Sequence, residues 1–108
     1  MAKHKPQYDL SVVQELITNE QFIIVKTAKQ TASQLGFNQE RIKDVILQIR
    51  RSDFNKSERD WQKKGHWQDA YKPCYEGIRL YLKWKIIENN GNSLLLLSFK
   101  EDEGGEDL

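Results

Sequence analysis

The chain of 108 residues has only one cysteine, Cys74, and two histidines, His4 and His66. A single cysteine excludes an internal disulfide framework and is typical of a protein kept in a reducing cytosol. The three residues show no metal-ligand spacing, so we expect neither a metal site nor a cofactor. A nucleophilic pair of Cys74 and His66 is a weak alternative, because a single cysteine at a strand end is usually unreactive.

Long apolar runs, glycine-rich phosphate loops and nucleophile elbows are also missing from the sequence. Apolar runs such as residues 94–97 are short, whereas a helix that spans a membrane needs about 18 apolar residues. No apolar stretch follows the basic segment 1–8, which therefore lacks the pattern of a signal peptide. We expect a cytoplasmic protein without membrane contact, with one domain and one modest core.

The formal net charge is only +1, but the charges are unevenly distributed. Residues 101–108 hold five acids and no base, so residues 1–100 have 17 bases and 11 acids. Between residues 41 and 85 there are twelve bases and six acids. On charge alone, a polyanionic partner and an ordinary solvated surface are equally good interpretations. The acidic end contains Gly104 and Gly105, and we expect a disordered tail at 101–108 behind a single domain at 1–100.

Residues 78–100 have the pattern of a β-hairpin. Apolar and polar residues alternate strictly from 78 to 86, as in a strand with one buried face. Asn90 and Gly91 are typical of a two-residue turn, because both turn positions need a positive φ. The predicted cross-strand neighbours are Leu82 and Phe99, Trp84 and Leu97, and Ile86 and Leu95 on the apolar face, with Lys83 and Ser98, and Tyr81 and Lys100, on the polar face.

Three helices and a short strand are predicted in the N-terminal half. Residues 11–14 form a capping box that opens a helix, and residues 22–25 form a short apolar strand. A second capping box at 27–30 opens a helix that stops at Gly36. Asn38 caps a third helix. The apolar stripe of this helix consists of Ile42, Val45, Ile46 and Ile49.

The C-terminal half begins with a polar stretch, 51–66, where we expect a mobile loop. Residues 67–73 alternate and predict a strand, in which Pro73 indicates an edge or a bulge. Residues 74–77 are a turn into the hairpin. Helices followed by consecutive strands predict an α+β domain, with the N-terminal helices packed on one face of an antiparallel β-sheet.

The other face of this sheet is predicted to be polar and basic. It collects Lys72, Arg79, Tyr81, Lys83 and Lys100, with Lys56 in the preceding loop. If residues 74–77 form a four-residue connection, Ala70 pairs with Tyr81, and Gln68 and Lys72 share this face. A three-residue connection would send Gln68 and Lys72 to the other side. Basic residues around an aromatic side chain are typical of single-stranded RNA recognition, and an ordinary solvated face is the alternative.

Such a face has the groups needed to cleave RNA. The 2′-hydroxyl of the substrate attacks the neighbouring phosphate, so the protein supplies proton transfer and stabilises the developing charge. Lys56 and Lys100 are candidates for charge stabilisation, and either of them is a candidate base. Tyr81 is a candidate proton donor or phosphate-orienting group, and Gln68 a nucleotide-holding amide. His66 is a weaker candidate, since a loop histidine is usually solvated.

Four short motifs make the chain similar to the MqsR toxins. They are SDFNKS at 52–57, WQDAYKP at 67–73, YLK at 81–83 and SFK at 98–100. The resemblance covers nearly the whole chain. It implies a RelE-like fold and the toxin of a bacterial type II toxin–antitoxin pair. Such a toxin is a sequence-selective, metal-independent endoribonuclease that cuts mRNA and slows growth, and the zinc of such pairs belongs to the antitoxin.

The resemblance implies catalytic roles for Lys56, Gln68, Tyr81 and Lys100. The expected RNA-binding residues of the same face are Lys72, Arg79 and Lys83. Lys72 stands where the family has an arginine, which removes bidentate phosphate contacts, and the acidic tail extends past the family's usual end. The implied partners are single-stranded mRNA and an MqsA-like antitoxin, with DNA contacted only through the antitoxin. The alternatives are a non-catalytic RNA-binding or translation-regulating module and a regulatory subunit that binds only a protein.

Overall fold

The computed structural model describes residues 2–88 and 90–103. The helices in this part of the chain are α1 (Leu10–Thr18), α2 (Lys26–Gln34), α3 (Gln39–Gln48) and the 3₁₀ helix η1 (Arg51–Asp53). The strands are β1 (Ala2–Lys3), β2 (Phe22–Ile24), β3 (Phe54–Arg59), β4 (Trp67–Tyr71), β5 (Cys74–Tyr75), β6 (Ile78–Glu88) and β7 (Asn92–Glu101). The fold is α+β, as predicted. None of these helices has the length and apolar character needed to cross a membrane.

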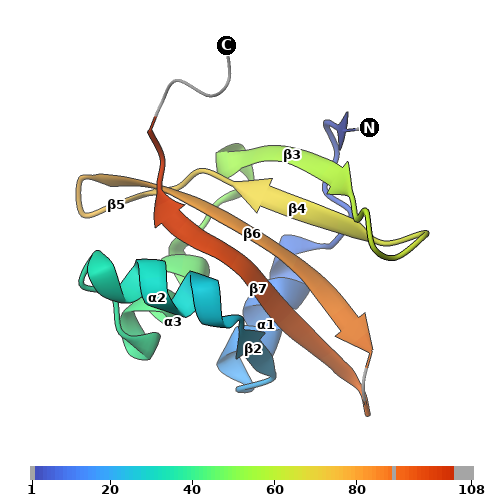
Figure 1. Ribbon diagram of the computed structural model, residues 1–108, viewed down its shortest axis with the longest axis horizontal. Helices are drawn as coiled ribbons and strands as arrows, with labels where there is room; N and C mark the ends of the chain where they lie inside the picture. The colour runs from blue at the N-terminus through green and yellow to red at the C-terminus, as the bar shows by residue number, and fades with distance from the viewer. Residues whose placement is uncertain (1, 89, 104–108) are drawn as a thin grey trace.

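The strands form one sheet in the order β1-β3-β4-β6-β7-β2, and β5 pairs with β6. All neighbours are antiparallel except β2 and β7, which are parallel. In Figure 1 the three helices gather around the β7 and β2 side of the sheet, while β1, β3 and β4 lie on the other side. The sheet is therefore wider than the three consecutive strands that the sequence predicts.

Side chains cap the starts of α1 and α3, whereas α2 has no side-chain cap. The carboxylate of Asp9 accepts a hydrogen bond from the backbone of Ser11 at 2.9 Å, so α1 begins before the predicted box at 11–14. The box at 27–30 was also a wrong prediction, because α2 begins at Lys26 after an extended Val25. Asn38 does cap α3, where its side chain accepts from the Arg41 backbone at 2.9 Å.

The predicted mobile loop at 51–66 is wrong, because most of it is η1 and β3. Strand β3 pairs with β1 on one side and β4 on the other, which leaves only residues 60–66 as a connection. The strand was missed because it is polar, and its one buried residue is Ser57. Strand β4 is consequently an interior strand. Pro73 lies beyond its end, and the carbonyl of Pro73 accepts from the Leu80 backbone at 2.9 Å.

One hydrophobic core joins the helices to the apolar face of the sheet. Trp84 is completely buried and stacks on Tyr71, with 4.8 Å between the ring centroids. Phe37, which follows α2, meets Phe99 of β7 at 5.1 Å. Removing each such side chain from water stabilises the fold by roughly 1.5–3 kcal/mol. This core holds β6 and β7 rigidly, so residues on their opposite face have defined positions.

The predicted hairpin register is right at one end and wrong at the other. Tyr81 pairs with Lys100, and Leu82 with Phe99, as predicted, but Trp84 pairs with Leu96 rather than Leu97. The predicted two-residue turn is wrong, because Glu88 pairs with Asn92 and three residues separate the strands. A bulge at Leu97 then restores the predicted register beyond it, since an extra residue in one strand shifts all later pairs by one.

The turn residues have the predicted positive φ angles, but β4 pairs with β6 two residues away from the predicted register. Asn90 and Gly91 have φ angles of 57° and 102°, as the turn residues require, while Asn89 lies outside the described residues. Ala70 pairs with Lys83 and not with Tyr81, because residues 74–79 form a small hairpin of their own. A shift of two residues keeps every side chain on its face, so Gln68 and Lys72 still share the face of Tyr81.

Candidate active site on the polar face of the sheet

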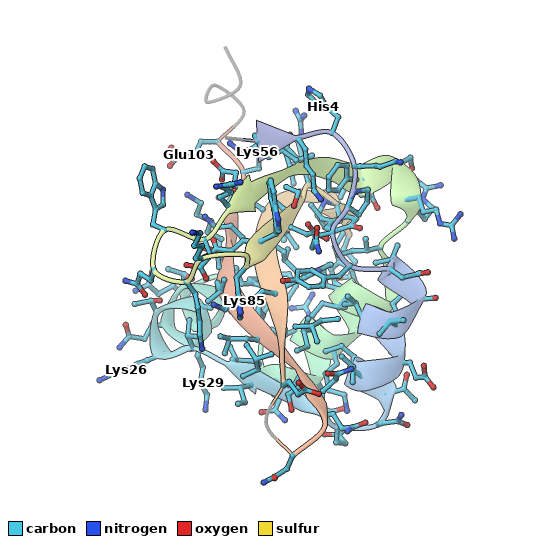
Figure 2. All side chains as sticks on the ribbon, turned by 90° about the vertical axis from the view of Figure 1, so that its right-hand side faces the viewer. His4, Lys26, Lys29, Lys56, Lys85 and Glu103 are labelled. Carbon is cyan, nitrogen blue, oxygen red and sulfur yellow. The ribbon has the colours of Figure 1, made fainter. Side chains whose placement is uncertain are left out.

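The polar face is the side of the sheet that the helical core does not cover. It carries Lys56, Gln68, Lys72, Arg79, Tyr81, Lys83, Lys85, Lys100 and Asp102. One row crosses four strands: Lys56 pairs with Ala70, Ala70 with Lys83, and Lys83 with Ser98. Tyr81 and Lys100 form the next pair along β6 and β7. In Figure 2, Lys85 and the helix α1 lie on opposite sides of the sheet.

Tyr81 and Lys100 are in direct contact. The Nζ atom of Lys100 lies 5.2 Å from the centroid of the Tyr81 ring, which is within the range of a cation–π interaction. The ring of Tyr81 is nearly buried, whereas Lys100 is exposed. The buried ring fixes the place of the phenol, and the exposed ammonium beside it is accessible to an anion. The structure thus brings together two of the four predicted catalytic residues.

Lys56 lies on the same face, on β3, in the row next to the Tyr81–Lys100 pair. Its Nζ atom lies 3.7 Å from the carboxylate of Glu58, and both side chains are more than a third exposed. Such a surface pair is worth about 0–1 kcal/mol, so a phosphate can displace the carboxylate. Two strand spacings separate Lys56 from Lys83, about 10 Å, and the small side chain of Ala70 lies between them.

Gln68 lies further along the polar face, in a cluster around Asp60. The carboxylate of Asp60 accepts a hydrogen bond from Lys85 at 2.5 Å, and both side chains are nearly buried. Hydrogen bonds from Lys85, from the Gln62 backbone and from Gln68 hold the pKa of Asp60 at about 2, below its usual value of 3.8. The sequence pattern did not reveal the pairing of Asp60 and Lys85, because it joins the residue after β3 to a residue of β6 that lies 25 positions further along the chain.

Lys72 lies at the other end of the polar face, beside a carboxylate that was expected in the tail. Its Nζ atom is 3.7 Å from Asp102, and the side chains are 16% and 3% exposed. The Asp102 backbone donates to the carbonyl of Arg79 at 2.8 Å. The folded sheet therefore extends past the domain boundary predicted at residue 100, and residues 104–108 lie outside the described part. Arg79 itself is exposed.

A small hollow adjoins Lys100, between α2 and β7. Its volume is about 120 Å³, and it is lined by Thr27, Ala28, Thr31, Leu97, Ser98, Phe99 and Lys100. Thr31 donates a hydrogen bond to the carbonyl of Phe99, which ties α2 to β7 at this point. The Leu97 bulge forms part of the wall. The bulge thus shapes the surface beside the Tyr81–Lys100 pair, as bulges near functional sites often do.

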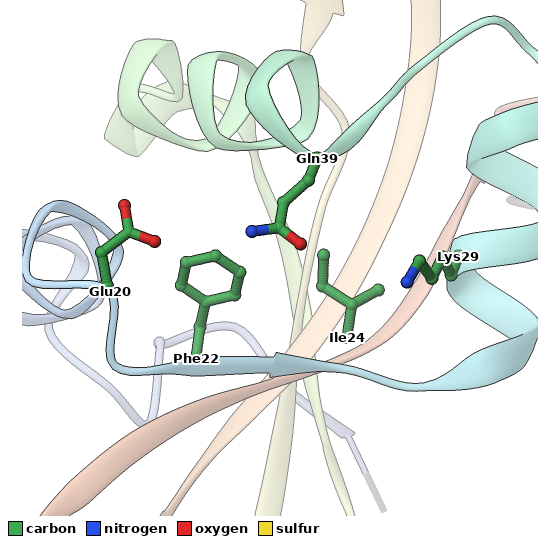
Figure 3. A pocket seen from close by; sticks show the side chains of 5 residues that line it. All are labelled: Glu20, Phe22, Ile24, Lys29 and Gln39. Carbon is green, nitrogen blue, oxygen red and sulfur yellow. The ribbon is translucent and has the colours of Figure 1, made fainter.

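A second hollow, of about 240 Å³, belongs to a different part of the molecule. Figure 3 shows its lining residues, Glu20, Phe22, Ile24, Lys29 and Gln39. All five come from the N-terminal half of the chain, whereas every predicted catalytic residue comes from β3 or a later strand. We therefore do not assign this hollow to the active site.

The remaining sequence candidates do not come together. His66 precedes β4 and Cys74 follows it, so the five-residue strand keeps them about 17 Å or more apart. The weak alternative of a Cys74–His66 nucleophilic pair therefore finds no support in this geometry. Within residues 2–88 and 90–103, no group of three or more histidine, cysteine or acidic side chains is arranged to hold a metal ion.

Two comparisons with known proteins found similar sequences over nearly the whole chain. The family described as "Motility quorum-sensing regulator, toxin of MqsA" matches residues 5–101. The mRNA interferase toxin MqsR of Escherichia coli strain K12 is 33% identical over 101 residues, which cover 94% of this chain and 99% of that protein. Both matches include all four strands that form the polar face. The chain belongs to the MqsR toxin family.

Proposed function

We propose that this protein is a sequence-selective mRNA endoribonuclease and the toxin of a type II toxin–antitoxin pair. The observation that carries the proposal is the contact between Tyr81 and Lys100 at the centre of a basic sheet face. Lys56 and Lys83 extend this face toward β3. Membership of a toxin family, and a relative named as an mRNA interferase, support the same activity.

In the proposed reaction the 2′-hydroxyl of one nucleotide attacks its own 3′-phosphate. The bond from phosphorus to the 5′-oxygen of the next nucleotide breaks, which leaves a 2′,3′-cyclic phosphate and a 5′-hydroxyl. Lys100 and Lys56 stabilise the negative charge that builds on the phosphate oxygens. One lysine takes the proton of the 2′-hydroxyl and the phenol of Tyr81 gives a proton to the departing oxygen. No group outside the protein and the RNA is needed.

The outer residues of the polar face bind and orient the strand. Gln68 is held against Asp60, and we assign it a contact to a nucleotide beside the cleaved bond. Lys83 and Arg79 contact neighbouring phosphates. Lys72 is mostly buried against Asp102, so its contribution to phosphate binding is smaller than that of the exposed Arg79.

An MqsA-like antitoxin is the proposed protein partner, and the proposed place of action is the cytoplasm. The family description, which names a toxin of MqsA, supports this partner. We expect contact with DNA only through the antitoxin. Co-expression of such an antitoxin should restore the growth of cells that produce the chain.

Cleavage of a defined mRNA in the presence of a chelator tests the enzymatic proposal. The wild-type chain should cut the RNA and leave cyclic phosphate ends, and Tyr81→Phe should lower the rate by about 10²–10⁴-fold with RNA binding largely intact. Lys29→Ala is the matched control, because this exposed lysine lies on α2 and lines the separate hollow. Binding without cleavage by the wild-type chain would favour the RNA-binding or translation-regulating module instead.

A further inference from the structure

The connection between β3 and β4 exposes a large aromatic side chain. Trp61 is 99% exposed, whereas Val12, Ile23 and Leu47 are 38%, 48% and 43% exposed. Tryptophan usually buries most of its large apolar surface. Trp61 therefore contributes almost nothing to the core, and its position is better explained by a ligand than by folding.

The loop that carries Trp61 is closed by hydrogen bonds. The Asp60 backbone donates to the carbonyl of His66 at 2.9 Å, and the His66 backbone donates to the carbonyl of Lys63 at 3.1 Å. The Asp60 carboxylate also accepts from the Gln62 backbone at 2.9 Å. Gly65 has a φ of 84°, which completes the turn. The indole is thus presented from a defined turn, one residue after a nearly buried carboxylate.

The same carboxylate fixes the loop to the polar face. Asp60 accepts a hydrogen bond from Lys85 of β6 and one from Gln68 of β4. Trp61 consequently stands at the end of the polar face, on the continuation of the strand that carries Lys56. The distance along β3 from Lys56 to Asp60 is about 13 Å, which a few nucleotides of an extended strand can span.

The charge around Trp61 suits a nucleic acid strand. Lys63 and Lys64 of the same loop are exposed, and the one acid of the loop, Asp60, is neutralised by Lys85. An exposed aromatic ring with basic neighbours is the combination that binds single-stranded nucleic acid, because every base can stack on the ring.

We infer that Trp61 is the stacking platform of an RNA subsite outside the catalytic centre. It takes one unpaired base of the substrate, a few nucleotides from the cleaved bond, while Lys63 and Lys64 contact the adjoining phosphates. The inference rests on the proposed endoribonuclease function and adds to it a preference for RNA long enough to reach the loop.

The test compares Trp61→Ala and Trp61→Phe on a long and a short single-stranded RNA that share one cleavage site. With the long RNA, Trp61→Ala should raise KM about tenfold with kcat unchanged, and Trp61→Phe should stay close to wild type. With the short RNA, which ends before the loop, all three chains should cleave equally. Leu47→Ala removes another exposed apolar side chain, on α3, and should change neither reaction.

The contrary outcomes separate this inference from the proposed function. Equal loss on both RNAs would mean that Trp61 acts on the fold or on the catalytic centre, and would overturn the subsite. Unchanged cleavage together with a weaker antitoxin complex would assign Trp61 to a protein interface and would also overturn it. If the wild-type chain neither binds nor cuts RNA, the proposed function fails and the subsite fails with it.

Discussion

The two faces of the sheet are built on the same strands but are stabilised differently. On the covered face, Leu80, Leu82, Trp84 and Phe99 are completely buried. On the polar face, lysines at both ends are held by acids from elsewhere in the chain, through the pairs Lys85–Asp60 and Lys72–Asp102. The covered face is therefore held by packing among the buried side chains of adjacent strands. The lysines of the polar face depend instead on Asp60, from a loop, and on Asp102, which follows β7.

The largest expected effect belongs to the covered face. Trp84→Ala should lower the free energy of unfolding by about 3–5 kcal/mol, because it removes a buried ring and leaves a cavity. Urea unfolding measures this loss. Leu47→Ala, at a partly exposed site, should cost much less. Similar losses for both variants would mean that the sheet is not packed as described.

Lys100→Ala, on the polar face, should lower the rate of RNA cleavage but leave the stability of the fold nearly unchanged. Loss of one charge-stabilising group typically lowers kcat by about 10²–10³-fold, while the exposed side chain contributes little to folding. RNA cleavage rates and urea unfolding of the same sample check both parts. A variant that unfolds easily but cleaves at the wild-type rate would contradict the division of roles between the faces.

Lowering the pH should remove the stability that the ionised Asp60 carboxylate provides through its hydrogen bonds. Since the pKa of Asp60 is depressed from 3.8 to about 2, the stability it provides is present above pH 4 and is lost as the pH falls toward 2. The loss should be about 1–2 kcal/mol. Unfolding curves from pH 5 to 2 should show a steeper decline for the wild type than for Asp60→Asn. Parallel curves would show that the carboxylate is not held by Lys85 in solution.

The smallest expected effect concerns the Lys72–Asp102 pair, at the end of the polar face away from Asp60. Asp102→Asn removes the negative charge beside Lys72, so the polar face becomes more positive around Lys72 and attracts a phosphate more strongly. RNA should bind severalfold more tightly, and the slope of log K against log salt should steepen by about 0.7. Binding of a non-cleaved RNA at several salt concentrations measures both. Weaker binding would show that Asp102 instead holds Lys72 in a productive position.

The covered face can be predicted well from the sequence, because the pattern that indicates it lies within one short stretch of the chain. Strict alternation in β6 identifies Leu80, Leu82 and Trp84 as one buried row, and the Asn90-Gly91 turn brings β7 beside it. The Tyr81–Lys100 pairing was predicted correctly even though the turn has one more residue than expected. The bulge at Leu97 compensates for that residue, and neither feature has a clear signal in the sequence.

The rest of the polar face has no such signal. Strand β3 was not predicted because it is a polar strand between two others, and its alternation marks only Ser57 as buried. Lys56 is therefore a strand residue opposite Ala70, and not a loop residue. The pairs formed by Asp60 and Asp102 join residues 25 and 30 positions apart, and periodicity carries no information about contacts at such separations. Only the family motifs identified Lys56 and Gln68 as site residues in advance.

The central claim is that the polar face uses the RNA's own 2′-hydroxyl to break the strand. The most direct measurement is cleavage of two RNAs that differ only by a single 2′-deoxy nucleotide on the 5′ side of the mapped cleavage site. The account predicts that the wild-type chain, in the presence of a chelator, cuts the all-ribose strand and leaves the substituted strand intact while binding both equally. Cutting of the deoxy-substituted strand at the same bond would contradict it.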